Sequence, residues 1–217
     1  MSYVFAPGCA LVLYKPELAD RIWQALNAAL GPMPLHSTCC HHEDGLPEGT
    51  TIINTCSGCD RRYRSRREGL ATVSLWEVAV GLPVFPLPDY GGLAVSVHDA
   101  CPTRTRPELH TAVRVLLQRM SITIIEAERT GANQACCGDS YYPAWPVDAI
   151  HEKMRQRAAQ MPADDVCVYC VSCVKAMALG GKRPRYLADL MYGEGTEPGD
   201  CDTVRWHGEV DRFIEEH

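Results

Sequence analysis

Short apolar runs along the chain are separated by longer stretches in which apolar residues recur every three or four positions. The runs are rich in β-branched and aromatic residues, which predicts strands over residues 3–5, 51–53, 93–97, 122–125 and 166–168. The longer stretches have the spacing of helices with one buried face. Because strands and helices alternate, we expect an α/β fold with largely parallel sheets.

Two of the expected helices begin with the same three residues, Pro-Glu-Leu, at Pro16 and at Pro107. Proline is tolerated in the first turn of a helix, and the helix dipole favours glutamate there. The apolar residues that follow share one face of each helix: Leu18, Ile22, Leu26 and Ala29 in the first, and Leu109, Val113, Leu116 and Met120 in the second. Further helices are predicted over residues 75–80, 147–161 and 186–192.

This repetition indicates two halves, which we place at residues 1–87 and 88–193. A chain of 217 residues is long enough for two small domains. The Pro- and Gly-rich segment at 83–92 is interpreted as their connection. Each half is predicted to be a small α/β unit, related to the other by a pseudo-twofold axis. Residues 194–217 form a polar tail, for which we expect a loop and a short terminal helix.

The cysteines repeat in the same way as the helix starts. Each half holds one cysteine, then an adjacent pair, then a Cys-x-x-Cys motif. The first set is Cys9, Cys39, Cys40, Cys56 and Cys59, and the second is Cys101, Cys136, Cys137, Cys170 and Cys173. Several of them directly follow a predicted strand, and ligands of parallel sheets gather at the carboxyl ends of strands. Thiolates are soft ligands that suit zinc and iron–sulfur clusters, so we predict one metal site in each half.

Disulfides are the main alternative for cysteines in pairs. The first residues lack the basic start and apolar run of a secretory signal, so we expect a cytoplasmic protein, in which structural disulfides are rare. Adjacent Cα atoms lie about 3.8 Å apart, closer than the roughly 4.4–6.8 Å of a relaxed disulfide. Neither adjacent pair can therefore bridge internally without strain. Outside the two sets, we expect Cys167 to be a small buried apolar residue and Cys201 to be a free thiol.

Charge excludes some functions and leaves one local question open. The net charge of −6 argues against a general nucleic-acid binder, and no apolar stretch approaches the roughly 18 residues of a membrane span. Five arginines nevertheless follow the first Cys-x-x-Cys motif: Arg61, Arg62, Arg64, Arg66 and Arg67. They are typical of a solvated helix start, but they could also anchor an anionic substrate or an acidic partner. His41 and His42 could bind the metal, donate hydrogen bonds to its sulfur ligands, or simply lie on the surface.

The cysteine pattern resembles that of the cysteine-rich CCG domain, which occurs twice in one of the subunits of heterodisulfide reductase and in related iron–sulfur proteins. That pattern is a single cysteine, then Cys-Cys-Gly, then Cys-x-x-Cys, and the second half matches it throughout, with Gly138 after the pair. The segment from His98 to Pro102 is also similar to the family's opening segment. The first half keeps the order, but His41 stands in place of the glycine. Only residues 41–55 separate the pair from the next cysteine there, against residues 138–169 in the second half.

The resemblance implies a noncubane 4Fe-4S cluster in one or both sites, held by five thiolates, with zinc as the alternative in the first site. It implies an oxidoreductase subunit that reduces a small disulfide or oxidises a dithiol. Electrons would enter from a ferredoxin-like iron–sulfur subunit, with a flavoprotein subunit behind it. The alternatives are an electron-relay subunit of a glycolate-, lactate- or glycerol-phosphate-oxidising complex, and a structural zinc protein.

Overall fold

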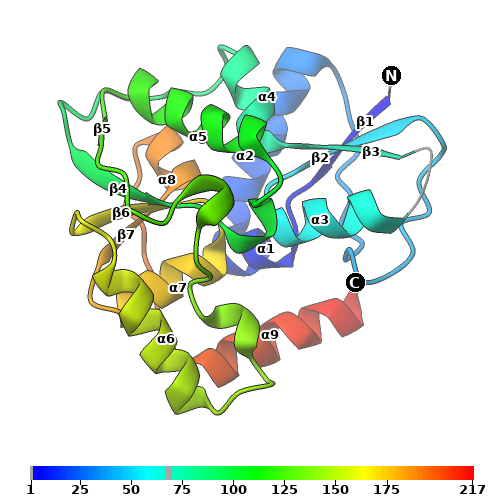
Figure 1. Cartoon of the computed structure of the whole chain (residues 1–217). Helices are drawn as coiled ribbons and strands as arrows, with labels where there is room; N and C mark the ends of the chain where they lie inside the picture. Colours follow the sequence, from blue (N-terminus) through cyan, green and yellow to red (C-terminus); the bar gives the residue numbers. More distant parts are fainter. Residues whose placement is uncertain (1, 67–69) are drawn as a thin grey trace. The chain divides into compact units, whose positions relative to one another are not determined.

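The structure, a computed structural model, describes residues 2–66 and 70–217, and the chain divides into two compact units (Figure 1). The first unit takes in Met1–Phe85 and His207–His217, and the second Pro86–Trp206. Each unit has a parallel sheet with helices, so the predicted α/β class with mostly parallel sheets is confirmed. The unit boundary lies close to the predicted one, but the end of the polar tail belongs to the first unit.

The first unit has a three-stranded sheet in the order β1-β2-β3, formed by β1 (Ser2–Ala6), β2 (Thr50–Asn54) and β3 (Ala71–Ser74). Its helices are α1 (Cys9–Tyr14), α2 (Pro16–Leu30), α3 (Ser57–Arg66) and α4 (Leu75–Gly81), joined by the last part of α9 (Thr203–Glu216). Buried side chains cover both faces of the sheet, and one buried cluster contains Val4 of β1, Ile52 of β2 and Tyr63 of α3. Leu18, Ile22 and Leu26 of α2 are fully buried, as are Ile52 and Ile53 of β2.

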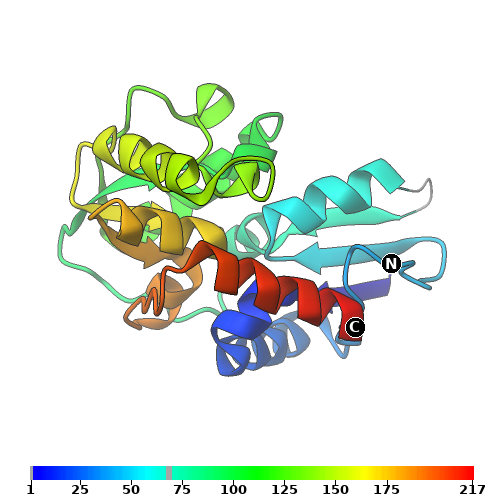
Figure 2. The same ribbon diagram turned by 90° about the horizontal axis from the view of Figure 1, so that it is seen from below.

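The second unit has a four-stranded sheet in the order β5-β4-β6-β7, formed by β4 (Ala94–His98), β5 (Thr123–Ile124), β6 (Asp165–Val168) and β7 (Arg183–Tyr186). Its α-helices are α5 (Pro107–Arg119), α6 (Val147–Ala159), α7 (Val171–Leu179) and α8 (Leu187–Tyr192), and its 3-10 helices are η1 (Cys101–Thr103), η2 (Gly131–Asn133) and η3 (Asp139–Tyr141). Helix α5 lies on one face of this sheet, and α6 and α7 lie on the other (Figure 1). Helices α6 and α7 lie side by side (Figure 2).

The strands of the two units are connected in the same order. In the second unit α5 leads from β4 to β5 at one edge, and the chain then crosses to β6 and β7. In the first unit the place of β5 is taken by a single bridge between Phe5 and Leu35, after which the chain continues to β2 and β3. Residues 31–49 contain no helix corresponding to α6. This agrees with the short spacing seen in the sequence, while the pseudo-twofold axis stays a prediction.

The five predicted strands and both Pro-Glu-Leu helix starts are confirmed, but the pattern missed β3 and β7. Strand β7 reads Arg-Pro-Arg-Tyr, which lacks an apolar alternation. It pairs with β6 at the edge of the sheet, where a proline is tolerated. Its charges are compensated by Asp165 of β6, which accepts from Arg183 at 2.8 Å and from Arg185 at 2.7 Å. Over the described residues, every helix is too short or too polar to cross a membrane.

Candidate metal centres

In both units a Cys-x-x-Cys motif lies where a strand ends and the next helix begins. Cys56 follows β2, and Cys59 lies in the first turn of α3. Cys170 and Cys173 occupy the same places between β6 and α7, where the Cys173 N–H donates to the Cys170 carbonyl at 3.0 Å. The positive end of a helix favours the thiolate form of a cysteine. The local fold therefore prepares these sulfurs to bind a cation.

The acidity of Cys56 reflects this position. A hydrogen bond from the Cys59 thiol is the largest of the effects that lower the pKa of Cys56 to about 6. Hydrogen bonds from the backbone N–H groups of Cys59 and Gly58 also lower this pKa. Together, the three hydrogen bonds outweigh burial, which raises it. A metal that enters this site therefore meets a sulfur that is already largely deprotonated at neutral pH.

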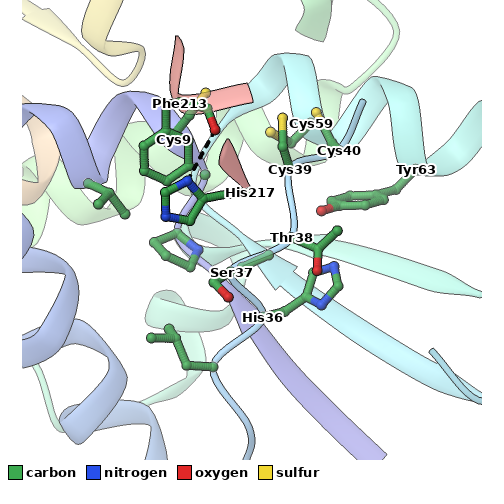
Figure 3. A pocket seen from close by; sticks show the side chains of 15 residues that line it. Cys9, His36, Ser37, Thr38, Cys39, Cys40, Cys59, Tyr63, Phe213 and His217 are labelled. Atoms are coloured by element: carbon green, nitrogen blue, oxygen red, sulfur yellow. Dashed lines mark hydrogen bonds between the residues drawn. The ribbon is translucent and has the colours of Figure 1, made fainter. Parts of the chain in front are cut away.

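All five cysteines of the first set come together here. The Cys59 thiol is hydrogen-bonded to Cys40 and to Cys56, and Cys39 is hydrogen-bonded to Cys40. Burial raises the pKa of Cys9 to about 12, and the negative charges of Cys56, Cys39 and Cys40 add to the effect, so Cys9 faces the same group. Figure 3 shows Cys39, Cys40 and Cys59 gathered at the pocket. Thiols from separate segments thus share one small volume.

Gly8 allows the segment after β1 to approach the Cys-x-x-Cys motif. Its φ is +75°, in the region that favours glycine, and an added Cβ would lie 3.3 Å from the Cβ of Cys56 and 3.5 Å from the Sγ of Cys59. A side chain at this position would therefore press on two of the sulfur-bearing residues. The glycine that precedes Cys9 is a packing requirement of the site.

The first site opens into a cavity of about 140 Å³ whose walls are largely apolar. Val12, Leu35 and Phe213 line it, together with the buried Tyr63. Burial is the main cause that raises the pKa of Tyr63, and the nearby thiolates raise it further, so the phenol stays neutral. The Phe213 ring stacks on the His217 ring with centroids 4.0 Å apart, beside the cysteines in Figure 3.

The end of α9 is attached to the loop that carries the adjacent cysteines (Figure 2). The Cys39 N–H donates to the His217 carbonyl oxygen at 3.2 Å, and the His42 ring binds the Ile214 carbonyl. His42 therefore has a structural contact, whereas its neighbour His41 is exposed. Neither histidine lines the cavity of the first site. The end of the polar tail thus contributes Phe213 and His217 to the wall of the first site.

The five cysteines of the second set also converge. The Cys136 thiol is hydrogen-bonded to Cys101 and Cys137, and Cys173 is hydrogen-bonded to Cys137 and Cys170. The hydrogen bond from Cys101 is the largest of several that hold the pKa of Cys136 far below its ordinary value. The Gly138 N–H, at 3.3 Å from the Cys136 sulfur, contributes to the same effect. A thiolate at Cys136 therefore has donors around it before any metal binds.

Gly138 lies against α6, where a side chain would require its neighbours to shift. Its φ is +117°, and an added Cβ would lie 3.0 Å from the Met154 Cγ and 3.2 Å from the Ile150 carbonyl oxygen. The third residue of the Cys-Cys-Gly motif is therefore glycine because a helix packs on it. The first unit has no such helix over residues 31–49, which explains why His41 can follow its cysteine pair.

His98 belongs to the second site, a role that the sequence did not reveal. One of its ring nitrogens and the sulfurs of Cys137 and Cys173 lie within 4.8 Å of one another, and all three residues are buried. The Nδ1 atom accepts from the Arg157 Nε at 3.2 Å, while the buried Nε2 has no hydrogen-bond partner among the described residues. Burial and the charge of Arg157 lower the pKa of His98 to about 3, so the ring is neutral. Because Nδ1 is an acceptor, the ring proton is on Nε2.

Asp99 fixes the turn that leads to Cys101. Its fully buried carboxylate accepts from both terminal nitrogens of Arg114 at 3.0 and 2.9 Å, and from the Tyr169 hydroxyl at 3.0 Å. Thr130 and the Gly131 N–H also donate to it, at 2.7 and 2.8 Å. Strand β4, α5 and the loop before η2 are thus tied together directly behind the cysteine. The network makes Asp99 a positioning residue.

The arginines after Cys59 divide into different roles. Arg64 forms an ion pair with the buried Asp60 at 3.0 Å and donates to the Thr72 carbonyl at 2.7 Å, so it fastens α3 to β3. Arg62 lies near enough to Cys39 and Cys40 that its charge lowers their pKa values, although burial has the larger effect on Cys39. Arg61 is exposed on α3. The side chain of Arg66 and the whole of Arg67 lie outside the described residues.

The two cysteines outside the sets behave as expected. Cys167 is fully buried in β6, and burial raises the pKa of its thiol. Cys201 is a free thiol on the segment before α9. No cysteine forms a disulfide, and the structure describes the whole set.

The donor sets suit a soft metal or an iron–sulfur cluster. Each site offers five thiols, one more than a tetrahedral zinc ion takes, and soft thiolates select zinc, copper(I) and iron–sulfur clusters. At the second site the Gly138 N–H already points to a sulfur, and the His98 Nε2 has no partner. Such N–H donors are the surroundings that metal-bound sulfur requires. The clustered cysteines could therefore bind metal in both units.

Comparison of the chain with models of protein families, with curated proteins and with solved structures gives no match.

Proposed function

We propose that the chain is an iron–sulfur oxidoreductase subunit, similar to the CCG-domain subunits of heterodisulfide reductase, that reduces a small disulfide or oxidises a dithiol. The convergence of the second set of cysteines carries the proposal. Their thiols form a continuous chain of hydrogen bonds from Cys101 through Cys136, Cys137 and Cys173 to Cys170. Five thiols in one volume exceed what zinc requires, and this favours a cluster with several metal atoms.

In this proposal each set of five cysteines holds a noncubane 4Fe-4S cluster, with zinc as the alternative at the first site. When bound, such a cluster would supply single electrons and a soft site for sulfur. The protein contributes the electrostatic surroundings. The neutral His98 offers an N–H, and the buried Arg157 offers a positive charge close to Cys137 and Cys173. Both compensate negative charge that would collect on the sulfur ligands.

Reduction of a disulfide by such a subunit breaks one S–S bond and forms two thiols. It consumes two electrons and two protons, and each electron would come from an iron–sulfur partner protein of the ferredoxin type, with a flavoprotein behind it. The cavity beside each set of cysteines gives a small molecule access to sulfur ligands. The second cavity reaches Cys136, whose sulfur accepts a hydrogen bond from the Gly138 N–H at 3.3 Å.

The test is metal and sulfide analysis of anaerobically purified protein, together with electron paramagnetic resonance. We expect iron and acid-labile sulfide, with loss of the second centre's iron and signal in Cys137→Ser. The Cys201→Ser variant is the matched control, because that thiol lies outside both sets. Zinc without iron, or unchanged iron in Cys137→Ser, would overturn the proposal. Iron without disulfide reduction by a viologen donor would instead assign the electron-relay role.

A further inference from the structure

A second cavity, of about 160 Å³, lies in the second unit beside the cysteine site. Its wall contains four cationic side chains, those of Arg104, Arg129, Lys153 and Arg157, and it reaches Cys136. No aspartate or glutamate contributes to this wall. The cavity differs in this respect from the largely apolar cavity of the first unit. Its chemistry is that of a site for an anion.

Arg157 is the most informative of the four cations, because it is only 2% exposed. Its guanidinium donates to the His98 Nδ1 at 3.2 Å, to the Gln160 Oε1 at 3.0 Å and to the Arg129 carbonyl at 2.9 Å. All three acceptors are neutral. A buried charge is strongly disfavoured unless an opposite charge compensates it. The thiolates on one side and an anion in the cavity on the other would supply that charge.

The other three cations are also without a carboxylate partner in the part of the chain that the structure describes. Arg104 donates to the Gln134 carbonyl at 3.2 Å, and Lys153 to the Gln156 side chain at 3.4 Å. Arg129 is an exposed residue of the segment before η2 and lines the same wall. By contrast, Arg155, on the same helix as Lys153, pairs with Glu152 at 3.5 Å and lies outside the cavity. The cations that lack a carboxylate partner among the described residues thus lie in the wall of the cavity that reaches Cys136.

We propose that this cavity binds the anionic group of a small thiol or disulfide, a carboxylate or a phosphate, and so brings the substrate's sulfur to the site held by Cys136. This inference rests on the proposed function and names the substrate class for it. Guanidinium groups bind carboxylate and phosphate through paired hydrogen bonds. The reaction at the sulfur is the reduction of a disulfide to two thiols, or its reverse. In the reducing direction the two electrons come from the iron–sulfur partner and the two protons from solvent.

The test measures binding to the anaerobically purified protein by calorimetry. The probes are mercaptoacetate, 2-mercaptoethanol and cysteamine, which are anionic, neutral and cationic thiols of similar size, with acetate and inorganic phosphate as anions without a thiol. We expect mercaptoacetate to bind most tightly and its affinity to fall with rising salt. Arg129→Gln and Lys153→Gln should each weaken it by up to about fivefold, as expected for partly exposed charge pairs. Arg155→Gln should leave it unchanged.

The outcomes separate this inference from the proposed function. If the three thiols bind equally, or if Arg129→Gln and Lys153→Gln bind mercaptoacetate as the wild type does, the anion site is refuted even where iron is present. If acetate or phosphate binds in a way that depends on Arg129 and Lys153 while iron is absent, the anion site stands and the iron–sulfur function fails. Stronger binding of phosphate than of acetate would assign the phosphate class of substrate.

Discussion

Replacing Asp99 with asparagine should destabilise the second unit by removing one buried charge behind Cys101. The carboxylate is fully buried and forms an ion pair with Arg114, whose nitrogens donate to it at 3.0 and 2.9 Å. Asparagine has nearly the same shape but no charge, and its NH2 group replaces one of the two oxygens, so it opposes either the Thr130 or the Tyr169 donor. The substitution therefore removes the ion pair with Arg114 and creates opposed donors within one network.

The magnitude follows from the pKa of Asp99 and from the cost of breaking a buried pair. Burial by itself would raise this pKa, but hydrogen bonding to Arg114 and its charge outweigh burial and lower the pKa from 3.8 to about 2. At 1.36 kcal/mol per tenfold change in proton affinity, the charged form contributes about 2 kcal/mol. The opposed donors add to this, so we expect the free energy of unfolding to fall by about 3 kcal/mol. This is at the low end for a broken buried ion pair, because Arg114 still pairs with Glu126.

The assay is thermal unfolding of the wild type and of Asp99→Asn between pH 7 and pH 3. About 2–4 °C per kcal/mol is typical of chains of this size, so the melting temperature should fall by about 6–12 °C at neutral pH. Because the folded-state pKa is lowered, the stabilisation is complete above about pH 4 and is lost as the pH falls towards 2. The difference in melting temperature between the wild type and Asp99→Asn should therefore become smaller below pH 4.

The matched control is Asp164→Asn, since that carboxylate is 77% exposed and pairs with Lys182 at 3.6 Å. An exposed pair contributes less than about 1 kcal/mol, so this variant should melt close to the wild type. The reasoning is refuted if Asp99→Asn and Asp164→Asn melt alike at pH 7. It is also refuted if the difference in melting temperature between Asp99→Asn and the wild type stays constant down to pH 3.

Two further substitutions test the surroundings of the second site. Gly138→Ala should lower stability by about 1–3 kcal/mol through strain and overpacking against α6, measured by urea unfolding. Gly181 also has a positive φ, but nothing lies within 4 Å of an added Cβ, so Gly181→Ala should lose less stability than Gly138→Ala. Equal losses of stability in the two variants would refute the packing argument. His98→Leu should make the reduction potential of the second centre more negative, because an N–H donor near its sulfurs is lost. An unchanged potential in a redox titration, with wild-type iron content, would exclude that role.

Most strands and the first turns of the main helices could be predicted because their signals are local. A run of β-branched residues, or a proline followed by glutamate, acts on its own segment. Strand β7 could not be predicted in this way, because its stability depends on a partner in another segment. Arg183 and Arg185 both pair with Asp165 of β6, which offsets their charge at this edge of the sheet. Such pairing is set by the fold and leaves no periodicity in the sequence of β7.

The cysteine sites divide in a similar way. The spacing of the cysteines predicted which thiols belong together, because the same order recurs at matching strand ends. The groups around them could not be predicted, since they come from distant segments. His98 is engaged by Arg157 of α6, and Asp99 is engaged by Arg114 of α5 and by Tyr169 after β6. Only the folded arrangement of these helices shows that the residues before Cys101 are the polar support of the second site.

The departure of the first half from the Cys-Cys-Gly pattern has a physical cause that bears on metal binding there. At Gly138 a glycine is favoured because its φ is +117° and because Met154 and Ile150 of α6 would have to shift to accommodate a Cβ. Residues 31–49 include no helix in the corresponding place, so His41 meets no such restriction and is exposed. The helix and the glycine are therefore absent together, for one reason. Since helix packing imposes the glycine, its absence is no argument against Cys39 and Cys40 as ligands, and without it the Cys40 thiol is hydrogen-bonded to both Cys59 and Cys39.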